Sequence, residues 1–378
     1  MIPASRWRAR WQALGRPFPH LPRLAARLVL AMLGAALAWS ALASLPGDNP
    51  APGHASKVAA SASATPAKTG RAKGDMALYA RIHARVAAGE GYYAAALGEQ
   101  RANRYPTRPF VAVRLPTLAR VQAAIGADGV RWLALALAAG GIAALFWRAP
   151  AAASLEERII AAALLAAGGG AAFSPVAGYD HDFIAGVLLT FALLAYRPDC
   201  WWPALIAAAA ALAVRELAAP FVLLWLGFAV AERRWREAAA IATVLAVFAG
   251  ALMLHAAAVE AARLPGDLAS QGWNARAGYG LPLAALGELT GLRHLPRMLA
   301  VPLAVLPLIG WAGLGGRMGL FAALWFAGLA TMMALFARPA NFYWVELALP
   351  AYAIGLAFAP RALAELIARA SSPSSRQT

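Results

Sequence analysis

The chain is 378 residues long, with 61% apolar residues, 14% charged residues and a net charge of +16. This apolar share exceeds what a soluble domain of this length needs for its core, which excludes a soluble globular protein and predicts a chain that lies in a lipid bilayer. The single cysteine, Cys200, excludes an internal disulfide, a thiol redox pair and a zinc site built from thiolates. Nucleic acid is not an expected partner, because arginines beside the helix ends of a membrane protein set its orientation and contact lipid headgroups.

Apolar runs recur along the chain at the length of roughly 20 residues that one helical crossing of a bilayer needs. About ten such runs are present, at 27–46, 129–147, 158–176, 183–197, 201–216, 218–231, 237–256, 298–314, 318–337 and 342–360. One long helix over the fifth and sixth runs would put Arg215, Glu216 and Pro220 at mid-membrane, which is costly for the charges and poor for helix continuity. We therefore predict two short helices that meet at an outer turn. The predicted fold class is all-α, a polytopic membrane helix bundle of about ten transmembrane helices.

Basic residues near short loops predict the orientation of the bundle. They precede the first run and follow the sixth and the last, at Arg6, Arg8, Arg10, Arg16, Arg23, Arg27, Arg233, Arg234, Arg236, Arg361 and Arg369. These residues belong on the cytoplasmic side, so both termini are expected in the cytoplasm. The start of the chain also has the basic region, apolar core and small residues of a secretory signal peptide, so cleavage is an alternative to a retained first helix.

The long segment after the first run is also basic, but long loops translocate largely regardless of charge, so we expect it in the periplasm. It contains an Ala/Ser/Pro/Lys-rich tether without an apolar period and two stretches with the spacing of helices that lie on a membrane surface. The predicted parts are a cytoplasmic basic segment (1–26), the first transmembrane helix (27–46), a periplasmic loop (47–128) with its tether (50–73) and surface helices (near 75–88 and 115–125), the bundle (129–360) with an outer loop (257–297), and a cytoplasmic tail (361–378).

Polar and ionisable residues gather at the predicted outer ends of the spans. They are Asp75 in "GDMALYARI", Asp180, His181 and Asp182 in "YDHDF", Arg215 and Glu216 in "RE", and Arg338, Asn341 and Tyr343 in "ARPANFYW". A transporter more typically carries its polar residues and broken helices near the midplane, in halves that resemble each other, and we find neither. The placement favours an enzyme with its site at the outer rim. A multi-pass transporter and a non-catalytic envelope assembly protein stay as alternatives, as does a polymerase or ligase of lipid-linked glycans.

Each of these residues also has a purely structural explanation. Asp75 can cap its helix, and Asp182 is well placed as the N-cap of the fourth run, with Asp180 solvating a short loop. The "RE" dipeptide can form an interfacial ion pair, and Arg338 can extend to phosphate headgroups. A histidine metal site is not expected, because no pair of outer histidines has ligand spacing.

Several stretches carry a family resemblance. An acid in "GDMALYARI", then "GEGYY" and "RYPTRPFVAVRLPTLA", follow the first span, and "VRELAAP" and "RPANFYWVELALPAYAIGLAFAP" come later. Together they resemble GT-C type glycosyltransferases, similar to protein mannosyltransferases and lipid A aminoarabinose transferases. The resemblance implies inverting transfer of a sugar from a polyprenyl-phosphate-linked donor to a periplasmic acceptor (a protein, lipid or glycan) at the bacterial inner membrane. Two features differ from the family pattern: the tether separates Asp75 from the first span, and Met76 stands where a second acid is common.

The resemblance also implies roles for single residues. Asp75 matches the first-loop acid and is the candidate catalytic base, while Asp180 or Asp182 matches a second outer-loop acid that would orient the acceptor or a metal. The departing phosphate needs guanidinium groups, for which the candidates are Arg215, Arg338 and Arg114. The expected supporting residues are Glu216, Tyr79, His181, Asn341 and Tyr343. A divalent cation is compatible with the outer acids, but no ligand spacing requires one, and no other cofactor is expected.

Overall fold

The computed structural model describes residues 15–43, 74–147 and 153–372, and within these ranges the chain forms helices and turns without a named strand. The predicted all-α class is confirmed for this part of the chain. The tether at 50–73 and Arg6, Arg8 and Arg10 lie outside the described residues. The chain divides into two compact units, unit 1 with Met1–Ser56, Gly141–Gly168 and Ala275–Thr378, and unit 2 with Lys57–Gly140 and Gly169–Asn274.

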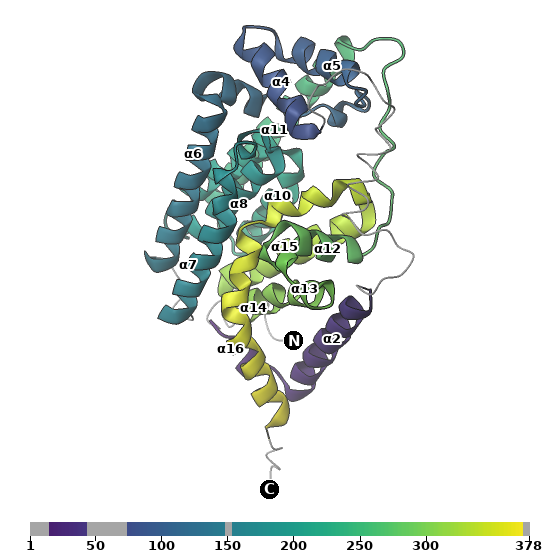
Figure 1. Ribbon diagram of the computed structural model, residues 1–378. Coiled ribbons are helices and arrows are strands. Elements are labelled where there is room, and N and C mark those ends of the chain that lie inside the picture. The colour runs from purple at the N-terminus through teal and green to yellow at the C-terminus, as the bar shows by residue number, and fades with distance from the viewer. Residues whose placement is uncertain (1–14, 44–73, 148–152, 373–378) are drawn as a thin grey trace. The chain divides into compact units, whose positions relative to one another are not determined.

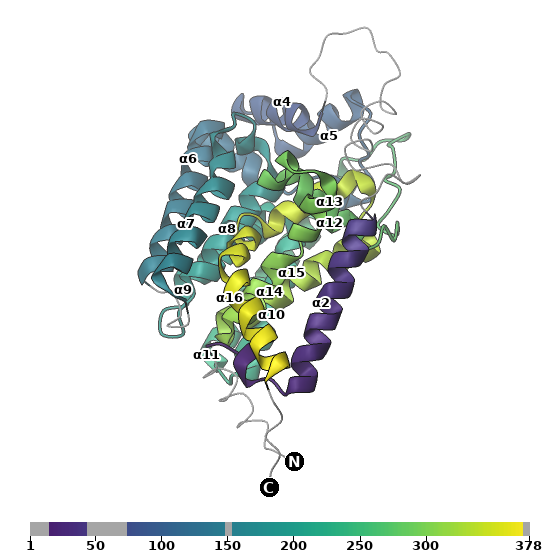
Figure 2. The same cartoon turned by 60° about the horizontal axis from the view of Figure 1, so that its bottom comes forward.

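Unit 1 holds the N-terminal and C-terminal helices. Its helices are α2 (Arg23–Ala43), α7 (Leu155–Gly169, which ends at the unit boundary), α12 (Gly280–Leu289), α13 (Arg297–Leu303), α14 (Leu306–Leu314), α15 (Gly316–Phe336) and α16 (Ala351–Ser371), with the 3-10 segments η1 (Phe18–His20), η6 (Gly291–His294) and η7 (Pro339–Ala348). The start of α2 meets the end of α16 (Figure 2), where Arg27 Nε donates to the carbonyl oxygen of Ala370 at 3.1 Å. Arg369 Nε donates in turn to the carbonyl oxygen of Leu21.

The contact between α14 and α16 depends on glycines. A Cβ atom placed on Gly310 would overlap the carbonyl oxygen of Gly355, and one placed on Gly355 would overlap that of Pro307. The two backbones therefore lie closer than any side chain would allow, which is how small residues join helices in membranes, where dispersion contacts replace the hydrophobic effect. Trp311 lies fully buried beside this contact and donates its indole N–H to the carbonyl oxygen of Ala351 at 3.2 Å.

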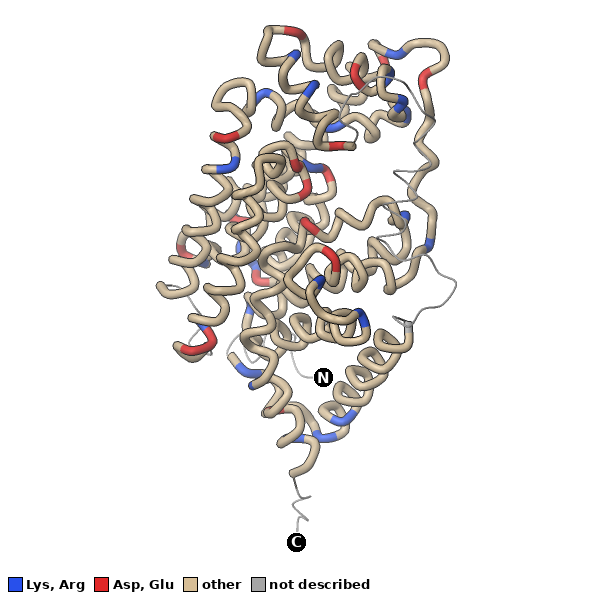
Figure 3. Tube along the Cα trace, in the orientation of Figure 1, with Lys and Arg blue, Asp and Glu red and all other residues tan. Residues whose placement is uncertain are grey.

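Unit 2 holds the remaining helices. They are α4 (Asp75–Ala87), α5 (Tyr92–Ala102), α8 (His181–Ala195), α9 (Trp202–Val214), α10 (Ala219–Ala231) and α11 (Trp235–Ala261), with η2 (Phe110–Ala112), η3 (Gly170–Phe173), η4 (Ala177–Tyr179) and η5 (Glu216–Ala218), while α6 (Thr117–Trp147) begins in unit 2 and ends in unit 1. Charged positions concentrate on α4 and α5 and at the turns, and the lengths of α8, α9 and α10 carry few (Figure 3).

Helices α8 to α11 run alternately between two ends of unit 2. At one end, Arg215, which follows α9, pairs with Asp182 in the first turn of α8. At the other end, Arg234, which precedes α11, donates to the carbonyl oxygen of Pro198 in the α8–α9 turn. Helix α11 returns to the first end, where Arg101 of α5 donates to the carbonyl oxygen of Ala262 at 2.8 Å.

The structure thus forms two short helices over 201–231, as predicted. Helix α9 ends at Val214, Arg215 has extended φ and ψ angles of −146° and 114°, and α10 begins four residues later. Because Pro220 stands in the first turn of α10, where its missing N–H costs nothing, the helix begins rather than breaks there.

Two predicted boundaries in unit 2 differ from the structure. The expected surface helix near 115–125 is the first part of α6, and Gly126, with φ of 76°, kinks that helix before the apolar part continues. This φ lies in the region that a side chain disfavours, so glycine permits the bend. Helix α5, over Tyr92–Ala102, was not predicted, because its run of small residues followed by polar residues lacks a clear apolar stripe.

In the part of the chain that the structure describes, six helical segments are long and apolar enough to cross a membrane, which makes this a helical membrane protein. They are Arg23–Leu42, Phe110–Trp147, Trp235–Ala261, Arg297–Leu314, Gly316–Phe336 and Ala351–Ser371. The other four predicted runs fall on α7, α8, α9 and α10, which have only 13 to 15 residues, so the total of ten crossings stays a prediction. The last run was expected at 342–360, but η7 occupies its start, and α16 continues through Pro360 to Ser371.

The tail predicted to begin at Arg361 is therefore helical at first. Arg361 Nε pairs with Glu157 of α7 at 2.6 Å, and its Nη1 pairs with Glu365 at 3.2 Å. These ion pairs within unit 1 hold the side chain of Arg361 against α7 and against the next turn of its own helix, which favours continuation of α16 past its first basic residue.

Candidate functional site

Ionisable side chains meet at the end of unit 2 where α8 begins and α9 ends. Asp182 Oδ1 lies 2.7 Å from Arg215 Nε, and Arg215 Nη1 contacts Glu216. Asp182 Oδ2 lies 3.6 Å from Arg114 Nη2, in the segment before α6. We call this group, with Tyr79 and His181, which contact it, the acid–arginine cluster. It contains two guanidinium groups and two carboxylates.

The core of the cluster is enclosed. The side chain of Arg215 is 1% exposed and that of Asp182 is 4% exposed. A guanidinium removed from water without a partner costs several kcal/mol, so the two carboxylates around Arg215 are what permits its burial. Arg215 was predicted to bind the donor phosphate with Glu216 holding it in place. The contact with Glu216 is present, but the side chain of Arg215 is enclosed by protein, so a phosphate cannot reach it in this arrangement.

Helix α4 joins the cluster through Tyr79. Arg114 Nε donates to the hydroxyl oxygen of Tyr79 at 3.0 Å, and its guanidinium carbon lies 5.9 Å from the centre of that ring. The Tyr79 ring meets the ring of His181 edge-on, with centroids 4.6 Å apart. The segment of Arg114 is itself anchored, because Tyr92 Oη donates to the Arg114 carbonyl oxygen at 2.5 Å. Tyr79 and His181 therefore contact the cluster, and the supporting role expected of them stays a prediction.

Asp75 lies on the same helix, one turn before Tyr79. It occupies the first turn of α4, where the helix dipole favours an acid, but the N-cap position belongs to Gly74, so Asp75 is not the helix cap. Its Oδ1 accepts a hydrogen bond from Tyr105 Oη at 2.9 Å, and the residue is partly exposed. Burial, followed by the negative charge of Asp75, raises the pKa of Tyr105 above its ordinary value, so Tyr105 remains a donor.

The N-cap of α8 is Asp180, not Asp182 as the sequence suggested. Asp180 is the N-cap of α8, since its Oδ1 accepts from the backbone N–H groups of Asp182 and Phe183 at 3.1 and 3.0 Å. Asp182, expected as the cap, is instead the buried partner of Arg215 and Arg114. The sequence suits either assignment, because both acids directly precede the apolar run. Both oxygens of Asp182 face guanidinium groups, a setting for an ion pair and not for a metal ligand.

His181 is held by its own turn. Its Nδ1 donates to the carbonyl oxygen of Tyr179 at 3.1 Å, which fixes the ring beside Tyr79. Arg338, Asn341 and Tyr343 belong to unit 1, where Asn341 Oδ1 accepts from the backbone N–H of Arg338 at 3.2 Å and Asn341 Nδ2 donates to Tyr343 Oη at 3.3 Å. These three residues thus organise the start of η7.

Several residues of the site were not predicted. Tyr105 contacts Asp75 across 30 residues of sequence, and Tyr92 contacts Arg114 across 22. A second group of charges fastens α4 to α5, where Arg81 Nε lies 2.9 Å and Arg85 Nη1 lies 3.2 Å from the carboxylate of Glu99. Burial acts to raise the pKa of Glu99, but the two guanidinium groups outweigh it and lower that pKa. The "GEGYY" and "RYP" stretches were the signals that marked these segments.

Comparison with known proteins does not place this chain in a family, since no protein-family model, curated protein or solved structure matches it. What the fold and the cluster define is a helical membrane protein with a buried acid–arginine cluster at one end of unit 2 and a partly exposed acid one helical turn away. The likeness to GT-C type glycosyltransferases stays a prediction.

Proposed function

We propose that this protein is a GT-C type membrane glycosyltransferase, which moves a sugar from a polyprenyl-phosphate-linked donor to an acceptor on the periplasmic side of the bacterial inner membrane. The observation that carries the proposal is the position of Asp75. Its partly exposed carboxylate lies one helical turn from Tyr79, which receives a hydrogen bond from Arg114 of the acid–arginine cluster. A non-catalytic assembly protein has no need to bring acids and arginines from four separate segments to one end of a helical unit.

The chemistry requires an acid and a cation near one another. In an inverting transfer, a carboxylate takes the proton of the acceptor hydroxyl as that oxygen bonds to the anomeric carbon. The bond from this carbon to the phosphate oxygen breaks, and its electron pair leaves with the lipid phosphate. The transition state resembles an oxocarbenium ion, and the phosphate that departs gains negative charge. Asp75 supplies the base, and a guanidinium supplies the charge that stabilises the leaving group.

Because Arg215 is more enclosed than Arg114, we assign the two arginines different roles. Arg114, whose side chain is 12% exposed, is the more exposed of the two arginines of the cluster and contacts Tyr79 of α4 directly, so we assign it the donor phosphate. Arg215, at 1% exposure, is a positioning residue that holds Asp182, and Asp182 in turn holds Arg114. Tyr105 positions Asp75 by binding Oδ1, which leaves Oδ2 to receive the proton of the acceptor.

The decisive experiment measures sugar transfer in membranes that contain the full chain, with a panel of labelled polyprenyl-phosphate sugars as donors. Replacement of Asp75 by Asn keeps the size of the side chain and removes the base. We expect a loss of about 10²- to 10⁴-fold in transfer rate, the usual contribution of general acid–base catalysis. The matched control is Asp128→Asn, because Asp128 is an exposed acid of the same unit that pairs with Arg131.

Two outcomes would contradict the proposal. If wild type and Asp75→Asn transfer sugar equally well, Asp75 is not the base. If wild type transfers no sugar from any donor of the panel, the proposed enzyme activity is wrong. Protein levels are matched by immunoblot, and Tyr105→Phe serves as a milder variant that keeps the packing of the ring while removing one hydrogen bond. It should retain part of the activity, with the loss in kcat and not in donor KM.

A further inference from the structure

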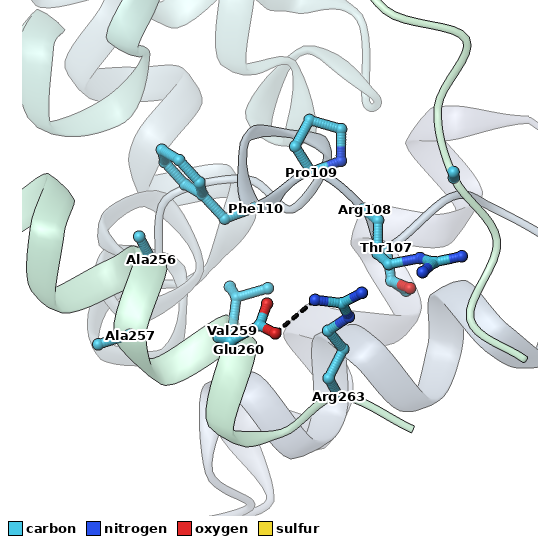
Figure 4. Close-up of a pocket in the computed structure, with 10 residues that line it drawn as sticks. Thr107, Arg108, Pro109, Phe110, Ala256, Ala257, Val259, Glu260 and Arg263 are labelled. Atoms are coloured by element: carbon cyan, nitrogen blue, oxygen red, sulfur yellow. Dashed lines mark hydrogen bonds and ion pairs between the residues drawn. The ribbon is translucent and has the colours of Figure 1, made fainter. Parts of the chain in front are cut away.

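A separate pocket opens in unit 2 at the end of α11. Its volume is about 650 Å³, and Figure 4 shows Pro109 and Phe110 on one side and α11 residues Ala256, Val259 and Glu260 on the other. Thr107, Arg108, Ala257, Arg263 and Ala269 complete the lining. The acid–arginine cluster contributes none of these residues, so the pocket is a distinct feature of the same unit.

The pocket combines an apolar wall with cationic groups. The wall consists of Phe110, Val259 and the two alanines of α11, and the charges are Arg108, Arg263 and Glu260. Arg263 pairs with Glu260 through Nη1 (Figure 4), so the charged lining carries a net charge of one positive unit, two arginines less one glutamate. Such a lining suits a ligand with an anionic head and an apolar body.

Arg108 also indicates that the pocket binds an anionic ligand. Its Nε atom is buried and has no hydrogen-bond partner among the described residues. Its backbone is fixed, since its N–H donates to the carbonyl oxygen of Leu268 at 3.2 Å and its carbonyl oxygen accepts from the N–H of Ser270 at 2.6 Å. A buried charged donor without an acceptor is unfavourable, and an anionic oxygen in the pocket would satisfy it.

The pocket adjoins an exposed apolar face of α11. Helix α11 is one of the six candidate spans, and Met253 and Leu254, directly before the pocket residues, are each 74% exposed. The end of a span lies at the level of the headgroups on whichever side of the bilayer it emerges. Glu260 and Arg263 stand at that end, so an apolar chain can follow the exposed side of α11 while its head enters the pocket.

We infer that the pocket binds a phosphate that carries an apolar chain, the headgroup of an anionic membrane lipid. Arg108 and Arg263 contact the phosphate oxygens, and the chain lies along Phe110 and the exposed face of α11. A guanidinium pair suits a phosphate, because its N–H groups match the spacing of the phosphate oxygens. The inference goes beyond the proposed sugar transfer and does not depend on it.

The test measures lipid binding to the purified full chain in a neutral detergent by native mass spectrometry. The probes are a short-chain phosphatidic acid, phosphatidylcholine of the same chain length, and inorganic phosphate. We expect phosphatidic acid to bind best, and Arg108→Gln and Arg263→Gln each to weaken it about tenfold, the usual effect of losing one hydrogen bond between charged groups. The matched control is Arg197→Gln, since Arg197 is an exposed arginine of unit 2 paired with Asp199.

A second variant tests the apolar wall without a change of charge. Ala256→Phe fills the pocket from α11 and should abolish lipid binding while the thermal unfolding temperature stays near that of wild type. Inorganic phosphate that displaces phosphatidic acid at equal concentration would show a plain anion site and contradict the role of the chain. Unchanged binding of phosphatidic acid by both arginine variants, or by Ala256→Phe, would overturn the proposal.

Discussion

The contact of α14 with α16 in unit 1 and the contact of α8 with α9 in unit 2 both join two helices, but different interactions hold them together. In unit 1, glycines bring two backbones together, and the contact is apolar apart from the indole N–H of Trp311. In unit 2, the ends of two helices are joined by Asp182 and Arg215, which are both almost fully enclosed. The first contact depends on shape alone. The second depends on a balance of charges that costs free energy to bury, and such a cost is expected where a cluster serves a function.

Of the substitutions that test this difference, removal of the buried cation Arg215 should lower the stability most. Arg215→Met keeps the length of the side chain but leaves Asp182 and Glu216 without their shared partner, so we expect a loss of about 3–5 kcal/mol in the free energy of unfolding. The measurement is urea or thermal unfolding of the full chain in detergent. The double variant Arg215→Met with Asp182→Leu should recover part of that loss, because it removes one of the two carboxylates that lose Arg215 as a partner. A single variant as stable as wild type would show that the pair is not buried.

A substitution at the glycine contact should come next. Gly310→Ala puts a Cβ against the carbonyl oxygen of Gly355, which is backbone and cannot rotate away. Overpacking of this kind costs about 1–3 kcal/mol. Gly227→Ala is the matched control, since nothing lies within 4 Å of a Cβ at Gly227 on α10. Equal stability of the two variants would mean that α14 and α16 separate without cost.

The smallest effect is expected at an ion pair of unit 2 between a partly exposed arginine and a buried acid, and it depends on pH. Arg101 Nε and Nη2 donate to the carboxylate oxygens of Asp267 at 2.7 and 2.9 Å. These hydrogen bonds are the main reason that the pKa of Asp267 lies well below its ordinary value. Its contribution to stability is therefore complete above the unfolded pKa of about 3.9 and is lost as pH falls below that value. Asp267→Asn should lower stability by about 1 kcal/mol at pH 7, because a charged hydrogen bond becomes a neutral one.

Unfolding measured over a series of pH values tests whether Arg101 and Asp267 form a charged pair. The difference in unfolding temperature between wild type and Asp267→Asn should narrow as pH is lowered below about 4, because the unfolded wild type then binds a proton at Asp267 that the folded state, with its lower pKa, does not yet bind. A difference that stays constant from pH 7 to pH 3 would show that Arg101 and Asp267 do not form a charged pair. Asp199→Asn, at an exposed pair, should change stability by less than about 0.5 kcal/mol throughout.

Much of the architecture was accessible from the sequence. Apolar runs of spanning length marked the six candidate spans, and the cost of placing Arg215, Glu216 and Pro220 at mid-membrane correctly separated α9 from α10. The gathering of Asp182, Arg215 and Glu216 at one end also followed, because alternating helices place every second turn on the same side. Periodicity failed at α5 and at the start of the last span, where small residues and a 3-10 segment carry no helical stripe.

The sequence by itself determined that this is a helical membrane protein and which charged residues stand at its helix ends, because the bilayer penalises both unsatisfied backbone and unpaired charge wherever they occur. Only the tertiary structure decided what each charged residue does. It made Asp180 the cap and Asp182 the ion-pair partner, enclosed Arg215, and brought Tyr105 to Asp75. These choices depend on contacts between residues 22 to 102 positions apart, where neither periodicity nor capping preference distinguishes one partner from another.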